Sequence, residues 1–252
     1  MITPTTLILG LGRDVGTACA RYFHEHGHNV AIASPNEEAL IRSSDELMGQ
    51  AVAHHGNLHT MIGMRNALNA AFEAYQRIDH LIIIPAVPQP ASLMDVNFET
   101  FDEATIRDAR AATLALRLFA EELKEQTPLV SDGPDRTRQS GTVTFVLSIS
   151  ARLASPGKFS ESISQAAIEA VVQAGAIELA EQGIRVNAIS AIRPRAEDDE
   201  PWLKARTPLG RAALADEIAE AVGFLASPGA AIITGETLIM DGGRLQLGGT
   251  LD

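Results

Sequence analysis

Strand-like and helix-like segments alternate along the whole chain, and this alternation constrains the fold more than any other feature. Short apolar runs are each followed by a segment with helical periodicity. The run at residues 80–84 is apolar after its first residue, as is typical of a strand buried on both faces of a parallel sheet. The alternation therefore predicts an α/β protein with a doubly wound parallel sheet and helices on both faces.

The apolar runs predict seven strands. The first starts at Thr6 and ends at the glycines that follow it, and the others are expected at residues 29–34, 50–54, 80–84, 142–148, 184–191 and 237–240. Helices are expected directly after Gly16 and at residues 36–48, 64–75, 101–124, 160–181 and 216–226. No internal repeat and no linker-like change of composition interrupts this order. We therefore expect residues 1–252 to form a single domain.

A glycine-rich turn separates the first strand from the first helix. Its glycines are Gly10, Gly12 and Gly16, and Val15 stands where the motif G-x-G-x-x-G would place its third glycine. A strand, a glycine-rich turn and a helix in this order are typical of the Rossmann-type fold, in which the helix N-terminus faces a pyrophosphate. Two interpretations remain open at this point: a phosphate-binding turn, or a tight turn without a ligand.

Composition excludes several classes of function. The net charge of −12 and the pI near 5.0 argue against nucleic acid binding, which favours a basic surface. No apolar run approaches the roughly 18 residues that a membrane span needs. The histidines near Gly27 are expected to be solvated rather than to bind a metal. The single cysteine, Cys19, is expected to be a packed thiol, and we expect a cytoplasmic protein.

The C-terminal third carries the most specific motifs. Gly183-Ile-Arg-Val-Asn-Ala188, Thr207-Pro-Leu-Gly-Arg211 and Ile233-Thr-Gly-Glu-Thr-Leu-Ile-Met-Asp-Gly-Gly243 resemble those of the short-chain dehydrogenase/reductase family, including members similar to 3-oxoacyl-acyl-carrier-protein reductases. The resemblance covers essentially the whole chain. It implies the Rossmann-type fold, NAD or NADP as cofactor, and interconversion of alcohols and carbonyls.

The resemblance also shows departures at the cofactor turn, which in the family reads T-G-x-x-x-G-x-G. Gly10 and Gly16 match its first and last glycines, but Asp14 replaces the middle one. A carboxylate there would repel a pyrophosphate. Arg13 matches a basic residue that often accompanies NADP preference. The resemblance therefore implies weak or no dinucleotide binding, with NADP favoured over NAD.

Further cofactor positions follow by the same matching. Ser34 ends the second strand, where NAD-dependent members usually carry an acid, and Asn57 matches an Asp that usually contacts adenine. Pro85 and Ala86 fall in the segment that reads Asn-Asn-Ala-Gly in the family. The candidate cofactor-binding residues are Gly10, Gly12, Arg13, Asp14, Val15, Gly16, Ser34, Asn57, Leu58, Pro85 and Ala86.

The family's catalytic residues are largely replaced. Glu161 stands at the position of the Tyr that transfers the proton, and Gln165 at that of the Lys four residues later. Asp108 replaces the Asn on the preceding long helix. The Ser is retained as Ser148, with Ser150 as an alternative of less natural spacing. The enoyl-reductase variant of the pattern would need a Tyr at the position of Lys158, and it is absent as well.

These replacements leave three hypotheses. The favoured one is a binding or structural homologue that has lost carbonyl reduction and works with a small-molecule ligand or beside an active paralogue. The second is an atypical enzyme, NADP-dependent or without cofactor, that uses Ser148 with Glu161 if burial raises the carboxyl pKa. The third, a conventional reductase, needs an acid from elsewhere. In similar proteins the helices at residues 101–124 and 160–181 pair about two-fold axes, which implies a homodimer or homotetramer.

Overall fold

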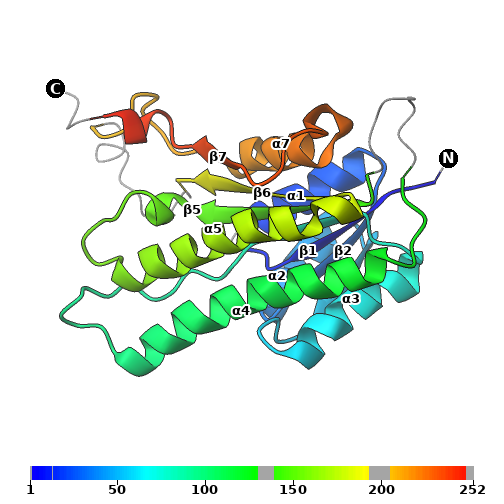
Figure 1. Ribbon diagram of the computed structural model, residues 1–252, viewed down its shortest axis with the longest axis horizontal. Coiled ribbons are helices and arrows are strands. Elements are labelled where there is room, and N and C mark those ends of the chain that lie inside the picture. The colour runs from blue at the N-terminus through cyan, green and yellow to red at the C-terminus, as the bar shows by residue number, and fades with distance from the viewer. Residues whose placement is uncertain (1, 13, 130–138, 193–204, 248–252) are drawn as a thin grey trace.

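The chain forms a seven-stranded parallel sheet with the strand order β3-β2-β1-β4-β5-β6-β7. The computed structural model describes all residues except 1, 13, 130–138, 193–204 and 248–252 (Figure 1). The strands are β1 (Thr5–Leu9), β2 (Asn29–Ser34), β3 (Ala51–His55), β4 (His80–Ile83), β5 (Gly141–Ser148), β6 (Ile184–Ala191) and β7 (Thr237–Met240). The predicted doubly wound Rossmann-type sheet is confirmed.

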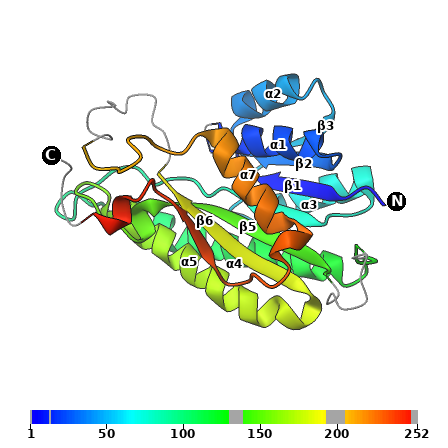
Figure 2. The ribbon, with the colours of Figure 1, turned by 90° about the horizontal axis from the view of Figure 1, so that it is seen from above.

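Helices cover both faces of the sheet (Figures 1 and 2). One layer contains α1 (Val15–Glu25), α2 (Glu37–Glu46) and α7 (Ala215–Ala226), and the other contains α3 (Met61–Tyr75), α4 (Phe98–Leu123) and α5 (Phe159–Leu179). Successive residues of β1 point to opposite layers: Leu7 and Leu9 pack with the α3–α5 layer, and Ile8 with the α1–α7 layer. Burial on both faces explains why these strands are apolar without alternation.

Two helices begin three residues earlier than predicted, and each has a capping side chain at its start. Before α3, the Thr60 hydroxyl accepts a hydrogen bond from the Gly63 backbone N–H at 3.1 Å. Before α4, the Asn97 side chain accepts one from the Glu99 backbone N–H at 2.9 Å. Such residues satisfy N–H groups that have no partner inside the helix, and their positions in the sequence were the signal for both starts.

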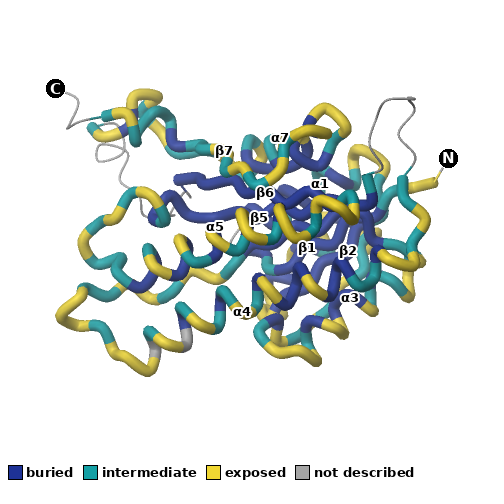
Figure 3. Tube along the Cα trace, viewed as in Figure 1, coloured by how far each residue is buried: buried dark blue, intermediate teal, exposed yellow. Residues whose placement is uncertain are grey.

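The centre of the sheet is buried, whereas the outer faces of α4 and α5 are exposed along much of their length (Figure 3). Cys19 lies in the buried part of α1, and burial raises the pKa of its thiol to about 12. The predicted packed thiol is thus confirmed. Among the helices of the described ranges, none combines the length and apolarity needed to cross a bilayer.

Candidate active site

The parallel sheet brings the predicted site residues to one edge. Because all strands run in the same direction, their carboxyl ends meet there. Gly10 follows β1, Ser34 ends β2, Pro85 lies two residues after β4, and Ser148 ends β5. Segments that are far apart in sequence therefore converge at this edge.

The glycines of the first turn are required by packing. Gly10 has φ of +84°, and a Cβ there would lie 2.3 Å from the Ile84 carbonyl oxygen. A Cβ on Gly16 would lie 2.6 Å from Leu11 Cα. Gly12 also has positive φ, at +44°. The close approach of β1, β4 and α1 is sufficient reason for glycine at residues 10 and 16, with or without a ligand.

Asp14 occupies the N-cap position of α1, which begins at the buried Val15. The Asp14 side chain is exposed and accepts no capping hydrogen bond. Its negative charge suits the positive end of the helix dipole, but it competes with any phosphate that would use the same end. Arg13 lies outside the described residues.

The polar side chains proposed for the adenine and ribose end make local contacts. Ser34 Oγ accepts a hydrogen bond from the Asn36 backbone N–H at 3.0 Å, and Asn57 Oδ1 accepts one from the His59 N–H at 3.0 Å. Leu58 is buried. Pro85 has no backbone N–H to donate, and Ala86 beside it is exposed. These positions therefore offer few free hydrogen-bonding groups.

Glu161 forms a compact polar cluster with the two serines at the end of β5. A 3₁₀ turn (Ile149–Ala151) follows β5 and brings Ser150 beside Ser148. Ser148 Oγ and Ser150 Oγ each donate a hydrogen bond to Glu161 Oε1 at 2.7 Å. The two serines were predicted as alternatives, but the structure uses both. The carboxylate is 2% exposed.

Lys158, which stands where the enoyl-reductase variant of the family pattern would place its Tyr, completes this cluster. Its Nζ lies 3.4 Å from both Glu161 Oε1 and Ser150 Oγ. Burial raises the pKa of Glu161, but the hydrogen bonds from Ser148 and Ser150 and the Lys158 charge outweigh it, so that the pKa is lowered. The raised pKa on which the atypical-enzyme hypothesis depended is therefore not found, because the hydrogen bonds from the two serines and then the Lys158 charge outweigh burial.

Gln165 lies one helical turn after Glu161 and is fully buried. Its Oε1 accepts a hydrogen bond from the Ser148 backbone N–H at 2.8 Å. This hydrogen bond thus connects the end of β5 to α5. The Gln165 side chain carries no charge with which to lower the pKa of a neighbouring proton donor.

Asp108 belongs to a second cluster, between α4 and α5. Its buried carboxylate accepts hydrogen bonds from Ser164 Oγ at 2.8 Å and from Arg107 Nε at 3.3 Å, and His59 Nε2 lies 3.7 Å away. Burial, and then the Arg107 charge, lower the pKa of His59, and Asp108 opposes them. Within the described residues Asp108 makes no hydrogen bond or ion pair with Ser148, Glu161 or Gln165, so the four predicted catalytic positions form two groups.

The arrangement matches that of a known family along almost the whole chain. A family model described as enoyl-(acyl carrier protein) reductase matches residues 10–244. The chain belongs to the short-chain dehydrogenase/reductase family. This confirms the family that the C-terminal motifs predicted.

Individual relatives cover almost all of the chain at low identity. A Neurospora crassa protein named short-chain dehydrogenase srdC is 27% identical, and the match covers 96% of this chain and 97% of that protein. A Rickettsia bellii 3-oxoacyl-acyl-carrier-protein reductase, FabG, is 26% identical, with 96% and 97% covered. The crystal structure of a Brucella melitensis 3-ketoacyl-acyl-carrier-protein reductase complexed with NADH superposes with a TM-score of 0.83 at 25% identity, with 96% and 98% covered.

The described residues of this family member do not fit a nicotinamide dinucleotide in the usual way. The glycine turn has the required backbone, but an exposed carboxylate stands at the helix N-terminus. The amide of Gln165, at the position of the ribose-binding Lys, is buried and donates to no partner in the described part of the chain.

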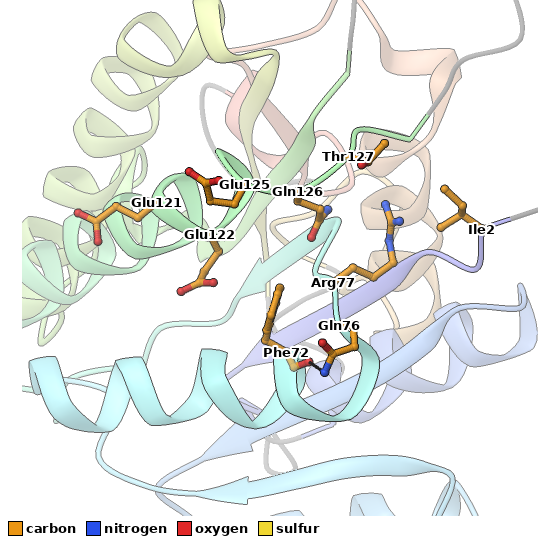
Figure 4. A pocket seen from close by; sticks show the side chains of 9 residues that line it. All are labelled: Ile2, Phe72, Gln76, Arg77, Glu121, Glu122, Glu125, Gln126 and Thr127. Atoms are coloured by element: carbon orange, nitrogen blue, oxygen red, sulfur yellow. Dashed lines mark hydrogen bonds between the residues drawn. The ribbon is translucent and has the colours of Figure 1, made fainter.

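Two cavities lie at different ends of the molecule. One, of about 470 Å³, adjoins the start of α5, and its lining is mostly apolar: Ser92, Leu93, Ala154, Ser155, Pro156, Gly157, Phe159, Ser162 and Ile163. The other, of about 420 Å³, lies near the amino ends of β1 and β4, away from Ser148 (Figure 4). Of its polar side chains, Arg77 pairs with Asp79 and Gln126 bonds to the backbone of Ile78. Neither cavity is lined by Ser148, Glu161 or Gln165.

Metal binding finds no support in the described ranges. They contain no group of three or more His, Cys, Asp or Glu side chains placed to hold an ion. The chemistry available at the Ser148 edge is therefore that of hydroxyl, carboxylate, ammonium and amide groups.

Proposed function

We propose that this chain is a short-chain dehydrogenase/reductase homologue that binds a small molecule and does not carry out ordinary NAD(P)H-dependent carbonyl reduction. One observation carries the proposal: the position of the family's proton donor holds a carboxylate that accepts hydrogen bonds from Ser148, Ser150 and Lys158. Each of these contacts favours the ionised form of Glu161.

Carbonyl reduction needs a protonated group within hydrogen-bond reach of the carbonyl oxygen. Glu161 is ionised at neutral pH because its pKa lies below the ordinary value of 4.5. The protons of Ser148 and Ser150 are directed to its Oε1. General acid catalysis contributes roughly 10²–10⁴-fold to a rate, so its loss leaves at most a trace of reduction.

We further propose weak or no dinucleotide binding, with NADP favoured over NAD. Asp14 supports weak binding through its charge at the N-terminus of α1. Ser34, at the end of β2, offers no carboxylate to the two ribose hydroxyls of NAD, and its Oγ already accepts from Asn36. The single, buried cysteine is in keeping with a protein of the reducing cytoplasm.

A homodimer or homotetramer formed through α4 and α5 remains our proposal for assembly, with an active paralogue as an alternative partner. Of the apolar residues on these two helices, Leu114, Leu118, Ile168 and Val172 are buried within the subunit. Ile106 and Ile177 are 65% and 78% exposed and are therefore the residues that support an interface.

A second function is favoured by the short contact between Ser148 and Glu161. An ionised carboxylate 2.7 Å from a hydroxyl can accept its proton, so the pair suits general-base chemistry on a substrate that needs no hydride. In this alternative the protein is an atypical enzyme, and Glu161 is a base rather than an acid.

An activity assay separates these functions. The unmodified protein, mixed with NADPH and cyclohexanone, should oxidise no NADPH above the background, and an active family member serves as the positive control. The double variant Glu161→Tyr/Gln165→Lys restores the proton donor and its cation. Robust reduction by the unmodified protein would overturn the proposal, and loss of that activity in Glu161→Gln would identify the carboxyl as the acid.

A further inference from the structure

Two histidines meet at the amino end of the sheet, opposite the edge that holds Ser148. His80 is the first residue of β4 and is buried, and His28 directly precedes β2. Their ring centroids lie 5.3 Å apart, and the Phe23 ring of α1 packs against both, at 5.1 Å from His28 and 6.1 Å from His80. His28 is one of the histidines near Gly27 that the sequence predicted to be solvated, and the structure instead places its ring in this cluster.

A buried polar row crosses the sheet at this pair. Its members are register partners on β1, β4, β5 and β6, and all four are buried: Thr6, His80, Thr142 and Arg185. Thr6 Oγ1 lies 3.0 Å from His28 Nδ1. Thr142 Oγ1 lies 2.8 Å from His80 Nδ1. Each imidazole is thus paired with a hydroxyl, which is a neutral group and supplies no negative charge to a protonated ring.

Both rings are neutral at pH 7 in the folded protein. Burial is the largest influence on each, and the pKa is lowered from the ordinary value of 6.5 to about 4 for His28 and to about 3 for His80. Asp79 favours a proton on His28, but this carboxylate is already paired with Arg77. The groups that oppose protonation of one ring or the other are the second ring of the pair, His26, Arg77 and Arg185.

We propose that His28 and His80 form an acid-sensitive lock, which keeps the turn between α1 and β2 packed against β4 only while both rings are neutral. A proton on either ring places a charge where the partners are a hydroxyl and a second imidazole. A buried charge without a counter-charge is costly, so acid favours the open state in which both rings are hydrated. Because hydrated rings regain their ordinary pKa, the lock opens with the uptake of two protons.

Stability is predicted to fall as the pH drops below about 6.5. In the folded protein neither ring binds a proton until the pH approaches 4, whereas unfolded histidines bind protons from about pH 6.5 downward. The contribution of the pair is therefore complete above about pH 6.5 and decreases below it. Between about pH 5 and 6, the uptake of roughly two protons should raise the unfolding equilibrium constant about a hundredfold for each pH unit.

Urea unfolding of the full-length protein between about pH 5 and 6 measures this rise. His80→Asn keeps a polar side chain for Thr142 and removes the titrating ring, so the rise per pH unit should be about tenfold smaller. His55→Asn, at an exposed residue of β3, is the matched control and should leave the rise unchanged. The comparison of the two variants also cancels the contribution of His59, whose pKa burial lowers. The readout is a pH dependence, so a variant that is less stable at every pH still reports.

If His80→Asn does not fold, the ring-proton NMR signals of His80 in the unmodified protein decide. They should keep the positions of a neutral ring at pH 5, where a solvated histidine is charged. An equal rise in His80→Asn and His55→Asn, or a His80 signal that titrates near pH 6.5, would overturn the inference. The experiment involves no ligand, so either result leaves the proposed function standing.

Discussion

The glycine turn after β1 and the Glu161 cluster after β5 lie at the same edge of the sheet, yet they have diverged from the family to different extents. The turn keeps Gly10 and Gly16. In the cluster, Glu161 replaces the family's proton donor and Gln165 replaces the neighbouring cation. In the turn, a Cβ on Gly10 would lie 2.3 Å from the Ile84 carbonyl oxygen. In the cluster, Glu161 and Gln165 lie within α5, and neither has the positive φ that would call for glycine.

This difference teaches that a retained motif is evidence of function only where packing does not also require it. The two glycines are needed so that β1, β4 and α1 can approach one another, and they would persist in a protein that binds no cofactor. The side chains at residues 161 and 165 are buried, but no backbone conformation of α5 requires a particular residue type there. Their replacement therefore says more about the reaction than the survival of the turn does.

The largest expected effect tests the structural role of the turn. Gly10→Ala should lower the free energy of unfolding by about 2–4 kcal/mol, because the new methyl group meets a carbonyl oxygen at positive φ. Gly27→Ala is the matched control: φ is +79°, but no atom lies within 4 Å of the added Cβ, so about 1 kcal/mol is expected. Urea unfolding measures both, and equal losses would contradict the packing argument.

The next effect concerns the charge of the cluster. Glu161→Gln replaces a buried, charged acceptor of three hydrogen bonds with a neutral amide and should cost about 1–3 kcal/mol at pH 7. The folded pKa of Glu161 lies below the ordinary value of 4.5, so its contribution is complete above that pH and is lost as the pH falls through the folded value. The difference between variant and wild type should therefore shrink below pH 4.5.

Glu169→Gln provides the control for that measurement. Glu169 lies two turns further along α5 and pairs with Arg152, whose side chain is 40% exposed. Its loss should cost less than the loss of Glu161, since exposed partners contribute little. If both variants lost the same stability, Glu161 would have no special role in the cluster.

A smaller effect tests the cofactor side of the comparison. Asp14→Gly removes the carboxylate at the start of α1 and should strengthen NADPH binding by about fivefold, as measured by calorimetry. Stability should change little through capping, because Asp14 accepts no capping hydrogen bond. Asp14→Asn keeps the size of the side chain and removes its charge, so it separates the effect of the charge from the effect of the size. Tight NAD binding by the unmodified protein would contradict the repulsion argument.

The smallest effect comes from Lys158. Lys158→Gln should raise the pKa of Glu161, because the cation 3.4 Å from its Oε1 is lost, and should change stability by less than about 1 kcal/mol. Carbon NMR of the Glu161 carboxyl across the pH range measures the shift. Lys124→Gln, at an exposed residue just after α4, should leave it unchanged. If the pKa of Glu161 were unchanged in Lys158→Gln, the two serines alone would account for its lowered value.

Much of this could be predicted from the sequence because the signals are local. Apolar runs and helical periodicity predicted all seven strands, and the bounds of β6 and β7 are those expected. The apolar pattern predicted the starts of α3 and α4 three residues too late. The capping residues Thr60 and Asn97 mark the true starts. Residue matching also predicted that Ser148 and Glu161 would meet, because the family has its Ser and Tyr at those positions.

The sequence by itself determined that no tyrosine or lysine stands at residues 161 and 165, and that the chain folds into a doubly wound sheet. Only the tertiary structure decided the state of the carboxyl that replaced them. A pKa depends on which donors and charges come within a few ångströms, and the turn after β5 and the start of α5 brought Ser150 and Lys158 there. Local patterns carry no such distances, so the sequence could not decide whether burial would raise the pKa of Glu161.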